Sequence, residues 1–183
     1  MEILVHWDTQ LFLFLNNLGC PQFDTFWLFV TDRLSWFPLY GILAIIIFEK
    51  FGWKKALLIL VCVALMIAVS DGLASLVKGW VKRPRPCLTS SLDGLFRLVI
   101  DSCRGRYCYF SAHAANSFAL AMYLSALFQK EHKYAPFLLF VWAAVVSYSR
   151  IYVGVHFPLD VLTGALVGLA IGWIFGKTLK IVV

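Results

Sequence analysis

The chain has 183 residues, of which 61% are hydrophobic and only 14% are charged, and its mean hydropathy is +0.82. Soluble domains are about 45 to 50% apolar, so this composition excludes an ordinary soluble protein and indicates that the lipid bilayer is the solvent. In a soluble chain the formal net charge of +6 would suggest nucleic acid. Here the basic residues lie between apolar stretches, where they suit lipid headgroups or a phosphate group, and we expect no nucleic-acid partner.

The N-terminal segment is expected to be a helix that lies in the membrane interface and does not cross the membrane. It has no basic start and no small-residue cleavage site, so it does not resemble a signal peptide. Its apolar run Leu11–Leu15 ends at Asn16 and Asn17, which is too short to cross about 30 Å of hydrocarbon. No polar, Pro-rich or Gly/Ser-rich linker follows, so we expect residues 1–183 to form a single membrane-embedded domain.

Apolar stretches in the rest of the chain are expected to be membrane-spanning helices, because open strands would leave backbone polar groups unsatisfied in lipid. The first is the least regular, since Asp32 and Arg33 precede its apolar part and Pro38 lies inside it, so a tilted or re-entrant start is an alternative. The predicted fold class is an all-α, multi-pass helix bundle with about five spans and an interfacial N-terminal helix. The spans cover residues 34–48, 56–79, 112–128, 135–152 and 160–176.

The order of the spans sorts the connections between them onto two membrane faces, because each crossing changes sides. Connections 49–55 and 129–134 share one face with the C-terminal tail. The long loop 80–111 and the short connection 153–159 share the other face. All ionisable motifs described below therefore meet at one face of the membrane.

The distribution of basic residues favours an orientation in the cell (inner) membrane with the motifs on the extracytoplasmic side. The bias is not clean, because the numbers of basic residues on the two faces become roughly even only if Lys78, Arg85 and Arg150 are set aside as functional. The lysines assigned to the cytoplasmic face are Lys50, Lys54, Lys55, Lys130, Lys133, Lys177 and Lys180.

Three of the five cysteines, Cys87, Cys103 and Cys108, fall in the long loop on the motif face. If that face is oxidising, a disulfide can form there, and Cys87 with Cys103 is the preferred pair. Three reduced thiols are the alternative. The spacing matches no common zinc pattern, so we predict no metal and no cofactor.

The first cluster of candidate site residues follows the second span, in the segment Lys78-Gly-Trp-Val-Lys-Arg-Pro-Arg85-Pro86. Arg85 lies between two prolines, which bias it to an extended conformation. Its planar guanidinium suits bidentate binding of phosphate oxygens. The stem of Lys78 can lie along hydrocarbon while its ammonium reaches the interface. The alternative is a basic cluster that only contacts lipid headgroups.

The second cluster, Phe110-Ser111-Ala112-His113, opens the third span. Free backbone N–H groups and the dipole at a helix start favour an anion, so Ser111 and Ala112 are candidate phosphate-binding residues. His113 can titrate near neutral pH and deliver a proton. The alternatives are a plain helix cap for Ser111 and an interfacial histidine bonded to a loop carbonyl for His113.

The third cluster, Ser149-Arg150-Ile-Tyr-Val-Gly-Val-His156-Phe-Pro-Leu-Asp160, combines an anion clamp, a nucleophile or base, and a carboxylate that can fix the imidazole tautomer. Pro158 is expected to begin the fifth span, which places Asp160 in its first turn. The alternative for Asp160 is therefore a favourable helix-start carboxylate. Several ionisable groups in an otherwise apolar stretch favour the functional interpretation.

These three segments resemble the signature of the type 2 phosphatidic acid phosphatase superfamily, which reads K-x6-R-P, then P-S-G-H, then S-R-x5-H-x3-D. The first and third elements match in order and spacing, and the resemblance extends over residues 55–175. The second element departs from it, with Phe110 for Pro and Ala112 for Gly, while Ser111 and His113 remain. Ala112 still offers a backbone N–H, but a conformation with positive φ would be disfavoured there.

The resemblance implies a metal-independent membrane phosphatase in which His156 attacks phosphorus to form a phosphohistidine. Asp160 would orient His156, and His113 would protonate the leaving oxygen. Water would then hydrolyse the intermediate. The phosphoryl oxygens would be neutralised by residues that replace the metal of other phosphatases, namely Lys78, Arg85, Ser111, Ala112 and Arg150.

The substrates that the resemblance implies are lipid phosphates or diphosphates, namely undecaprenyl diphosphate, phosphatidate-type lipids and lipid A phosphate, and the residues do not choose among them. Soluble acid phosphatases and vanadium haloperoxidases share the signature, but the spans favour the lipid phosphate branch. The alternatives are an anion channel or transporter, and a protein that binds lipid phosphate without turnover. An anion transporter gives no reason for the spacing of His156 and Asp160.

Other polar residues have two possible interpretations. Asp71 lies within the second span on nearly the same helix face as Lys78, where a functional role and pairing inside the bundle are both open. Asn116 and Ser117 are interpreted as helix packing. Several loop residues can steer an anionic headgroup, although a solvated loop is the simpler interpretation: Lys82, Arg83, Arg97, Arg104 and Arg106.

Overall fold

The computed structural model describes residues 2–103, 105–129 and 132–182, the last three of them as backbone only. Lys130 and Arg104 lie outside the described residues, as does the side chain of Lys180. The described chain is helical, which confirms the predicted all-α class. Its helices are α1 (Glu2–Asn17), α2 (Asp24–Thr31), α3 (Phe37–Val81), α4 (Ala112–Phe128), α5 (Ala135–Tyr152) and α6 (Pro158–Val182), with short 3-10 turns at Pro21–Phe23, Leu34–Trp36, Pro86–Leu88 and Ser90–Leu92.

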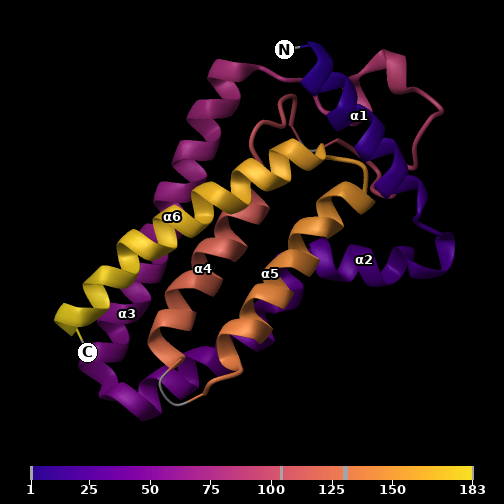
Figure 1. Ribbon diagram of the computed structural model, residues 1–183. Coiled ribbons are helices and arrows are strands. Elements are labelled where there is room, and N and C mark those ends of the chain that lie inside the picture. The colour runs from indigo at the N-terminus through magenta and orange to yellow at the C-terminus, as the bar shows by residue number, and fades with distance from the viewer. Residues whose placement is uncertain (1, 104, 130–131, 183) are drawn as a thin grey trace.

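The 45-residue α3 contains two of the expected spans, because the chain changes direction at Gly52. Gly52 has φ 72° and ψ 162°, which are not helical values, and glycine accepts a positive φ at no steric cost. The two halves of α3 correspond to the expected spans 34–48 and 56–79, and the bend lies at the end of the bundle where the C-terminus also lies (Figure 1). Within the described part of the chain, three segments are long and apolar enough to cross a membrane: Leu34–Val81, Ala135–Tyr152 and Pro158–Leu179.

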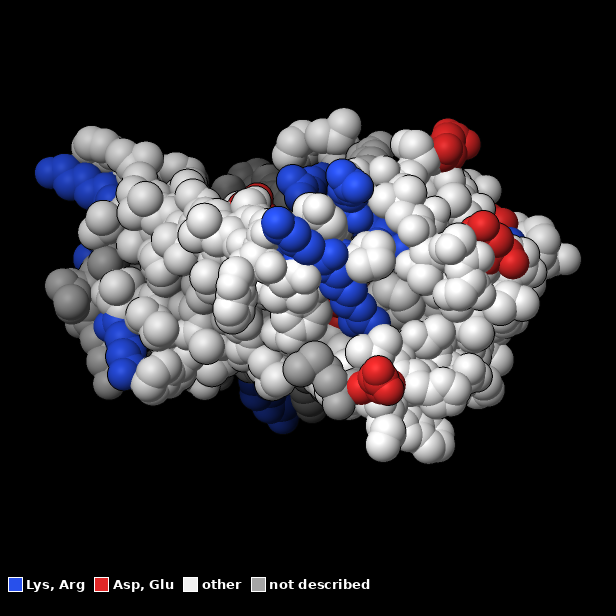
Figure 2. Space-filling model, turned by 90° about the horizontal axis from the view of Figure 1, so that it is seen from above, with Lys and Arg blue, Asp and Glu red and all other residues white. Residues whose placement is uncertain are grey.

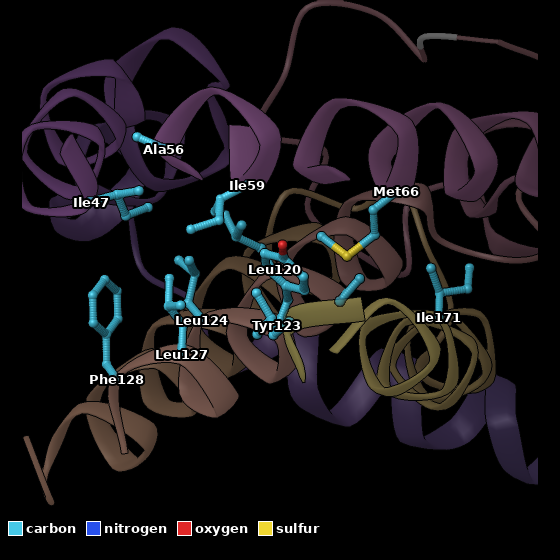
Figure 3. Close-up of a cluster of buried hydrophobic side chains, with 12 residues drawn as sticks. Ile47, Ala56, Ile59, Met66, Leu120, Tyr123, Leu124, Leu127, Phe128 and Ile171 are labelled. Carbon is cyan, nitrogen blue, oxygen red and sulfur yellow. The ribbon is translucent and has the colours of Figure 1, made fainter. Parts of the chain in front are cut away.

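The 17-residue α4 occupies the middle of the bundle, with α3, α5 and α6 around it (Figure 1). Its apolar side chains are mostly enclosed by protein. Tyr123 is fully buried and belongs to one core cluster with Ile59 and Met66 of α3 and Ile171 of α6 (Figure 3). This shared core fixes the positions of the helices whose opposite ends carry the candidate site residues.

A row of glycines brings α6 into backbone contact with α4. The glycines are spaced four residues apart, so they share one helix face. A Cβ atom at any of these positions would lie 2.2 to 2.4 Å from a backbone carbonyl oxygen of α4, so only glycine permits this approach. The pairs are Gly164 with Ser111, Gly168 with Ala115 and Gly172 with Ala119.

The expected N-terminal interfacial helix corresponds to α1, which lies across the end of the bundle where the long loop lies (Figure 1). Its buried residues, Asp8, Phe12 and Asn16, recur every fourth position and so form one face toward the protein. Apolar side chains such as Ile3 and Trp7 are exposed on its other faces. This pattern is typical of a helix with one face on protein and the other in the interface.

Substitution of Gly168 by alanine is expected to lower the melting temperature of the detergent-purified protein. The new Cβ would lie 2.2 Å from the Ala115 carbonyl oxygen, and overpacking of this kind costs about 1 to 3 kcal/mol. Gly72→Ala is the matched control, because a Cβ at Gly72 meets nothing within 4 Å. Equal melting temperatures for the two variants would show that the close approach does not stabilise the fold.

Candidate active site

The predicted site residues meet at the end of the bundle that carries the long loop. The ends of α3 and α5 and the starts of α4 and α6 converge there (Figure 1). Figure 2 looks onto this end and shows Lys and Arg side chains gathered in the middle of the face. The convergence expected from the order of the spans is therefore present in the structure.

His156, in the turn between α5 and α6, forms a buried pair with Asp160 in the first turn of α6. His156 is 2% exposed and Asp160 is fully buried. The His156 Nδ1 atom lies 3.4 Å from Asp160 Oδ2, and the same oxygen accepts the Phe157 backbone N–H at 3.0 Å. Because Nδ1 faces the carboxylate, Nε2 is the ring nitrogen that faces away from it. The pair is therefore arranged so that Nε2 can act as a nucleophile or base.

The turn before His156 is tight because its backbone folds back on the end of α5. The N–H groups of Val155 and His156 both donate to the Arg150 carbonyl oxygen, at 3.1 and 3.3 Å. Gly154 has φ +84°, and a Cβ there would lie 2.8 Å from the Arg97 carbonyl oxygen. Glycine is required on both grounds, and the turn keeps Arg150 next to His156.

Burial removes the charged form of His156 near neutral pH. Desolvation lowers the pKa of His156 to about 4, and this effect outweighs the hydrogen bond and charge of Asp160, which act in the opposite direction. The positive charges of Arg150 and Arg85 lower the pKa further. A neutral imidazole has a free lone pair on Nε2, which a nucleophile requires.

Three cations of the predicted set surround this pair. Arg85 is 6% exposed and extended, as predicted from its flanking prolines, and its Nη1 donates to the Val155 carbonyl at 3.1 Å. Its Nε has no hydrogen-bond partner among the described residues. Arg150 is 7% exposed and donates to Thr31 Oγ1 at the end of α2. Lys78 lies in the last turn of α3, where it interacts electrostatically with Arg85 and Asp160.

The start of α4 faces the same cations. Ser111 is the N-cap, with its Oγ accepting the Ala114 N–H at 3.4 Å, and its own N–H donates to the Asp160 carbonyl at 2.9 Å. His113 follows one residue into α4, and the charges that act on it most strongly are those of Arg150, Arg33, His156 and Lys78. His113 at the start of α4 and His156 in the turn before α6 therefore share one electrostatic environment.

The altered second motif is accommodated without strain at its alanine. Phe110 is 2% exposed and packs against Ala74 of α3 and Ala115 of α4, so its ring fills space between these helices. Among the described residues other than glycine, Lys82 is the only one with a positive φ. Ala112 therefore needs no glycine conformation in this chain.

The long loop is held over the site by a disulfide and a short backbone pairing. Cys87 and Cys103 are joined, with Cα atoms 6.3 Å apart, which confirms the preferred pair. The Cys108 N–H donates to the Arg83 carbonyl at 3.0 Å, and its thiol donates to the Pro84 carbonyl at 3.1 Å. Burial raises the pKa of the Cys108 thiol far above its usual value, so this cysteine is a neutral structural donor.

Two loop arginines are partly buried in ion pairs, which corrects the simpler interpretation of a solvated loop. Arg83 forms ion pairs with Asp8 at 2.6 Å and Asp160 at 3.0 Å. Arg97 forms a two-oxygen ion pair with Asp24, with contacts of 2.7 and 2.9 Å. Lys82 and Arg106 are exposed, as expected for a solvated loop.

The structure also places residues at the site that the motifs did not indicate. Asp8 lies in α1 and Thr31 in α2, both far in sequence from the residues that they contact. Asn16 binds three backbone carbonyls, those of Arg97, Ile151 and Tyr152, and so fixes α1 to the end of α5. The sequence offered one signal for Asp8 and Asn16: they are polar residues eight positions apart, and so on one face, in a mainly apolar helix.

A cavity of about 490 Å³ opens beside His113 and extends between α3, α4 and α5. Its polar lining residues are Thr31, Asp32, Arg33, Asp71, His113, Asn116 and Ser117. Asp71 and Asn116 are joined by a 2.9 Å hydrogen bond. Asp71 is therefore paired inside the bundle, one of the two interpretations open from the sequence. The rest of the lining is mainly apolar and includes Tyr40, Leu43, Ile47, Leu60, Leu120 and Leu124.

Comparisons with known proteins identify the family of this chain. The family model of the PAP2 superfamily matches residues 59–180. A lipid A 4'-phosphatase of Bacteroides thetaiotaomicron is 36% identical over 177 residues, which cover 96% of this chain and 78% of that protein. The crystal structure of Aquifex aeolicus LpxE has a TM-score of 0.69 and 29% identity, covering 92% of this chain and 94% of that one. A crystal structure described as the first transmembrane PAP2-type phosphatidylglycerolphosphate phosphatase, from Bacillus subtilis, shares the fold, with a TM-score of 0.78 at 21% identity over 98% of this chain and 88% of that one.

The family match covers most of the chain and includes all three motifs, so the chain belongs to the PAP2 superfamily, as the sequence resemblance predicted. Within that superfamily it is a membrane-embedded lipid phosphate phosphatase of PAP2 type.

Proposed function

We propose that residues 1–183 act as one phosphatase domain that transfers the phosphoryl group of a lipid phosphate or diphosphate to His156 and then to water. The observation that carries the proposal is the buried His156–Asp160 pair, with its Nε2 directed away from the carboxylate and cations around it. Nε2 attacks phosphorus, an N–P bond forms, and the bond from phosphorus to the lipid oxygen breaks. His113 donates a proton to that leaving oxygen.

The second half of the reaction restores the enzyme. His113, now neutral, accepts a proton from water as the water oxygen attacks phosphorus. The N–P bond breaks, orthophosphate leaves, and the electron pair returns to Nε2 of His156. Asp160 keeps Nδ1 protonated throughout and stabilises the positive charge on the phosphorylated ring.

The charge of the phosphoryl group is neutralised by protein cations in this proposal. Lys78, Arg85 and Arg150 supply three positive charges, and the Ser111 hydroxyl and the Ala112 backbone N–H add the start of α4. Arg85 supports this role because its buried Nε lacks a hydrogen-bond partner among the described residues. A dianionic phosphate would satisfy it and offset the repulsion among the cations.

The cavity supports a lipid leaving group. In phosphoryl transfer the attacking and leaving atoms lie roughly in line across phosphorus. His113, the proposed acid on the leaving side, lines the cavity, whereas His156 does not. An apolar chain attached to the leaving oxygen would therefore extend into the apolar space between α3, α4 and α5.

Substrates fall into three classes: undecaprenyl diphosphate, phosphatidate-type lipids and lipid A phosphate. We propose lipid A phosphate as the first to test, because the Bacteroides relative that covers 96% of the chain is described as a lipid A 4'-phosphatase. The hydrogen-bonding groups of a glycolipid could also pair with polar residues of the cavity lining, such as Asp71 and Asn116.

Replacement of His156 by alanine is expected to lower the rate of orthophosphate release by the purified protein in EDTA by at least about a thousandfold, because no nucleophile remains. The assay would compare lipid A, undecaprenyl diphosphate and dioleoyl phosphatidate. His132→Ala is the control, since His132 lies at the other end of the bundle and is exposed. Wild-type protein that binds these lipids without releasing phosphate would support the binding or transport alternative, and activity that requires a metal would contradict the proposed mechanism.

The pH dependence of kcat/KM is expected to reflect the burial of His156. The neutral ring is the nucleophile, so activity is present above the His156 pKa and is lost as the pH falls through it. Because burial lowers that pKa to about 4, the fall of kcat/KM on the acidic side of the pH profile, its acidic limb, should lie near that pH. A limb near 6.5, the value of an unperturbed histidine, would contradict this assignment.

We also propose that the site faces the extracytoplasmic side of the cell (inner) membrane. The Cys87–Cys103 disulfide in the loop above the site supports this orientation, because disulfides persist in oxidising compartments.

The orientation is tested in intact cells with a membrane-impermeant maleimide. Labelling at Cys87 and Cys103 should appear only after treatment with an impermeant reductant, and a Cys87→Ser/Cys103→Ser variant should lack it. A cysteine introduced at exposed Lys54 at the opposite end, on a background without other cysteines, should label only after permeabilisation. The reverse pattern would overturn the proposed orientation.

A further inference from the structure

We propose that Arg83 and Asp8 are positioning residues for the His156–Asp160 pair, and that α1 thereby forms part of the catalytic apparatus. This inference rests on the proposed function of His156. Asp8 lies outside the three sequence motifs, and Arg83 occupies one of the unspecified positions of the first. Both connect to the nucleophile through Asp160 and do not contact the phosphate in this arrangement.

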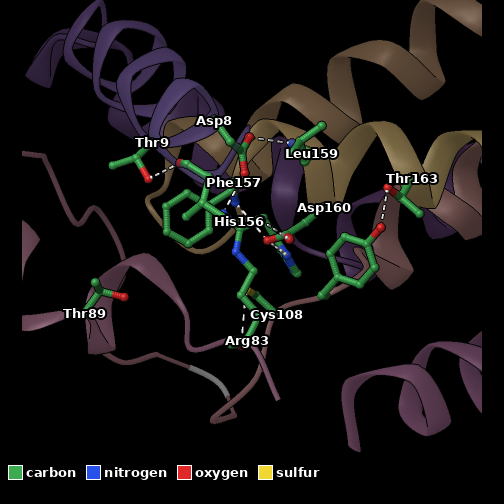
Figure 4. A network of polar contacts seen from close by, with 12 residues as sticks. Asp8, Thr9, Arg83, Thr89, Cys108, His156, Phe157, Leu159, Asp160 and Thr163 are labelled. Atoms are coloured by element: carbon green, nitrogen blue, oxygen red, sulfur yellow. Dashed lines mark hydrogen bonds and ion pairs between the residues drawn. The ribbon is translucent and has the colours of Figure 1, made fainter. Parts of the chain in front are cut away.

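The guanidinium of Arg83 bridges two carboxylates (Figure 4). Its Nη1 donates to Asp160 Oδ1 at 3.0 Å, and its Nη2 donates to Asp8 Oδ2 at 2.6 Å. The guanidinium carbon also lies 3.9 Å from the centre of the Phe157 ring, so the cation stacks on the residue next to the nucleophile. A planar fork can hold two carboxylates in this way, whereas an ammonium is a single point charge.

Both oxygens of the Asp160 carboxylate are therefore occupied. Oδ2 faces His156 Nδ1 and the Phe157 N–H, and Oδ1 receives Arg83. This fixes the rotation of the carboxylate, and hence the direction of the imidazole that it orients. Two carboxylates outweigh the effect of burial and raise the pKa of Arg83, so the clamp remains charged.

Asp8 completes the clamp from α1. It is 4% exposed, on a helix whose other faces are apolar and exposed, and its Oδ1 accepts the Leu159 N–H at 2.8 Å in the first turn of α6. Burial raises the pKa of Asp8, while Leu159 and Arg83 oppose that rise. Isolated buried carboxylates are costly, and every described contact of Asp8 goes to Arg83 or to the helix that carries Asp160.

The charges explain why two carboxylates are useful here. With His156 neutral, Asp8, Asp160 and Arg83 carry a net charge of −1. In the phosphorylated state the imidazole ring becomes positive, and the group as a whole becomes neutral. Without Asp8, the positive charge of Arg83 would cancel the negative charge of Asp160. With Asp8 present, one negative charge remains to balance the positive imidazole ring.

The test measures steady-state kinetics of lipid phosphate hydrolysis by Asp8→Asn, Arg83→Gln and Arg83→Lys in detergent. Loss of a partner that orients a catalytic group typically lowers activity by ~10- to 100-fold. We expect a decrease of that size in kcat for Asp8→Asn and Arg83→Gln, with KM within about twofold of wild type, because the phosphate contacts remain. Arg83→Lys should be intermediate, since it keeps the charge but bridges only one carboxylate.

The matched control is Asp24→Asn. The Asp24–Arg97 pair also joins an N-terminal segment to the long loop, with a 2.7 Å contact, but it touches none of the residues assigned to catalysis. Loss of this pair should affect stability without changing kcat, which should stay close to wild type. Equal losses of kcat in Asp24→Asn and Asp8→Asn would assign Asp8 a merely structural role.

A second measurement, the acidic limb of kcat/KM, separates positioning from loss of folding. The charged groups that face His156 are Asp160 of α6, Arg150 of α5, Arg85 of the loop and His113 of α4. Removal of the Arg83 charge strengthens the field of Asp160 and should move the limb to higher pH. Removal of the Asp8 charge strengthens the field of Arg83 and should move it to lower pH.

Opposite shifts of the limb, with reduced kcat in both variants, are the expected result. Wild-type kcat in Asp8→Asn and Arg83→Lys, or shifts in the same direction, would overturn the inference. Arg83→Lys provides the answer if Arg83→Gln fails to fold by size-exclusion chromatography. Absence of phosphate release by wild-type protein would instead contradict the proposed function, so the two failures are distinguishable.

Discussion

Backbone contact between α4 and α6 determines where the reactive groups of this protein can lie. Three glycines of α6 rest directly on carbonyl oxygens of α4, and the approach continues to the helix starts, where the Ser111 N–H donates to the Asp160 carbonyl. A side chain at any of these glycines would separate the two helices. The positions of His113 on α4 and Asp160 on α6 thus depend on the absence of side chains deeper in the bundle.

The electrostatics of the site follow from this packing. The helix ends bring Lys78, Arg85 and Arg150 together, and the Asp160 carboxylate beside them is already engaged by Arg83. Cations held close together repel one another, and under the proposed mechanism an arriving phosphate would offset that repulsion. Binding and transition-state stabilisation would then use the same groups.

The sequence predicted the parts of the site that are local or that depend on topology. The spacing of Arg150, His156 and Asp160 reflects one turn and one helix start, and the order of the spans placed the distant motifs on one face. The contacts of Asp8, Arg83 and Thr31 were not predictable, because they join segments far apart in the chain. The composition of the loop that contains Arg83 is also that of a basic loop exposed to solvent. The bend at Gly52 and the Asp71–Asn116 pair likewise depend on which helices become neighbours.

The position of the cavity has a consequence for how the two products separate under the proposed mechanism. His113 stands at the boundary between the basic region and the apolar space of about 490 Å³. Once the ester bond breaks, the inorganic product remains among the cations, and the alcohol remains on an apolar tail. The tail can return to bilayer hydrocarbon while phosphate exchanges with water, so neither product has to cross the environment that suits the other. Solvent preference alone would then oppose the reverse reaction and clear the site for the next lipid.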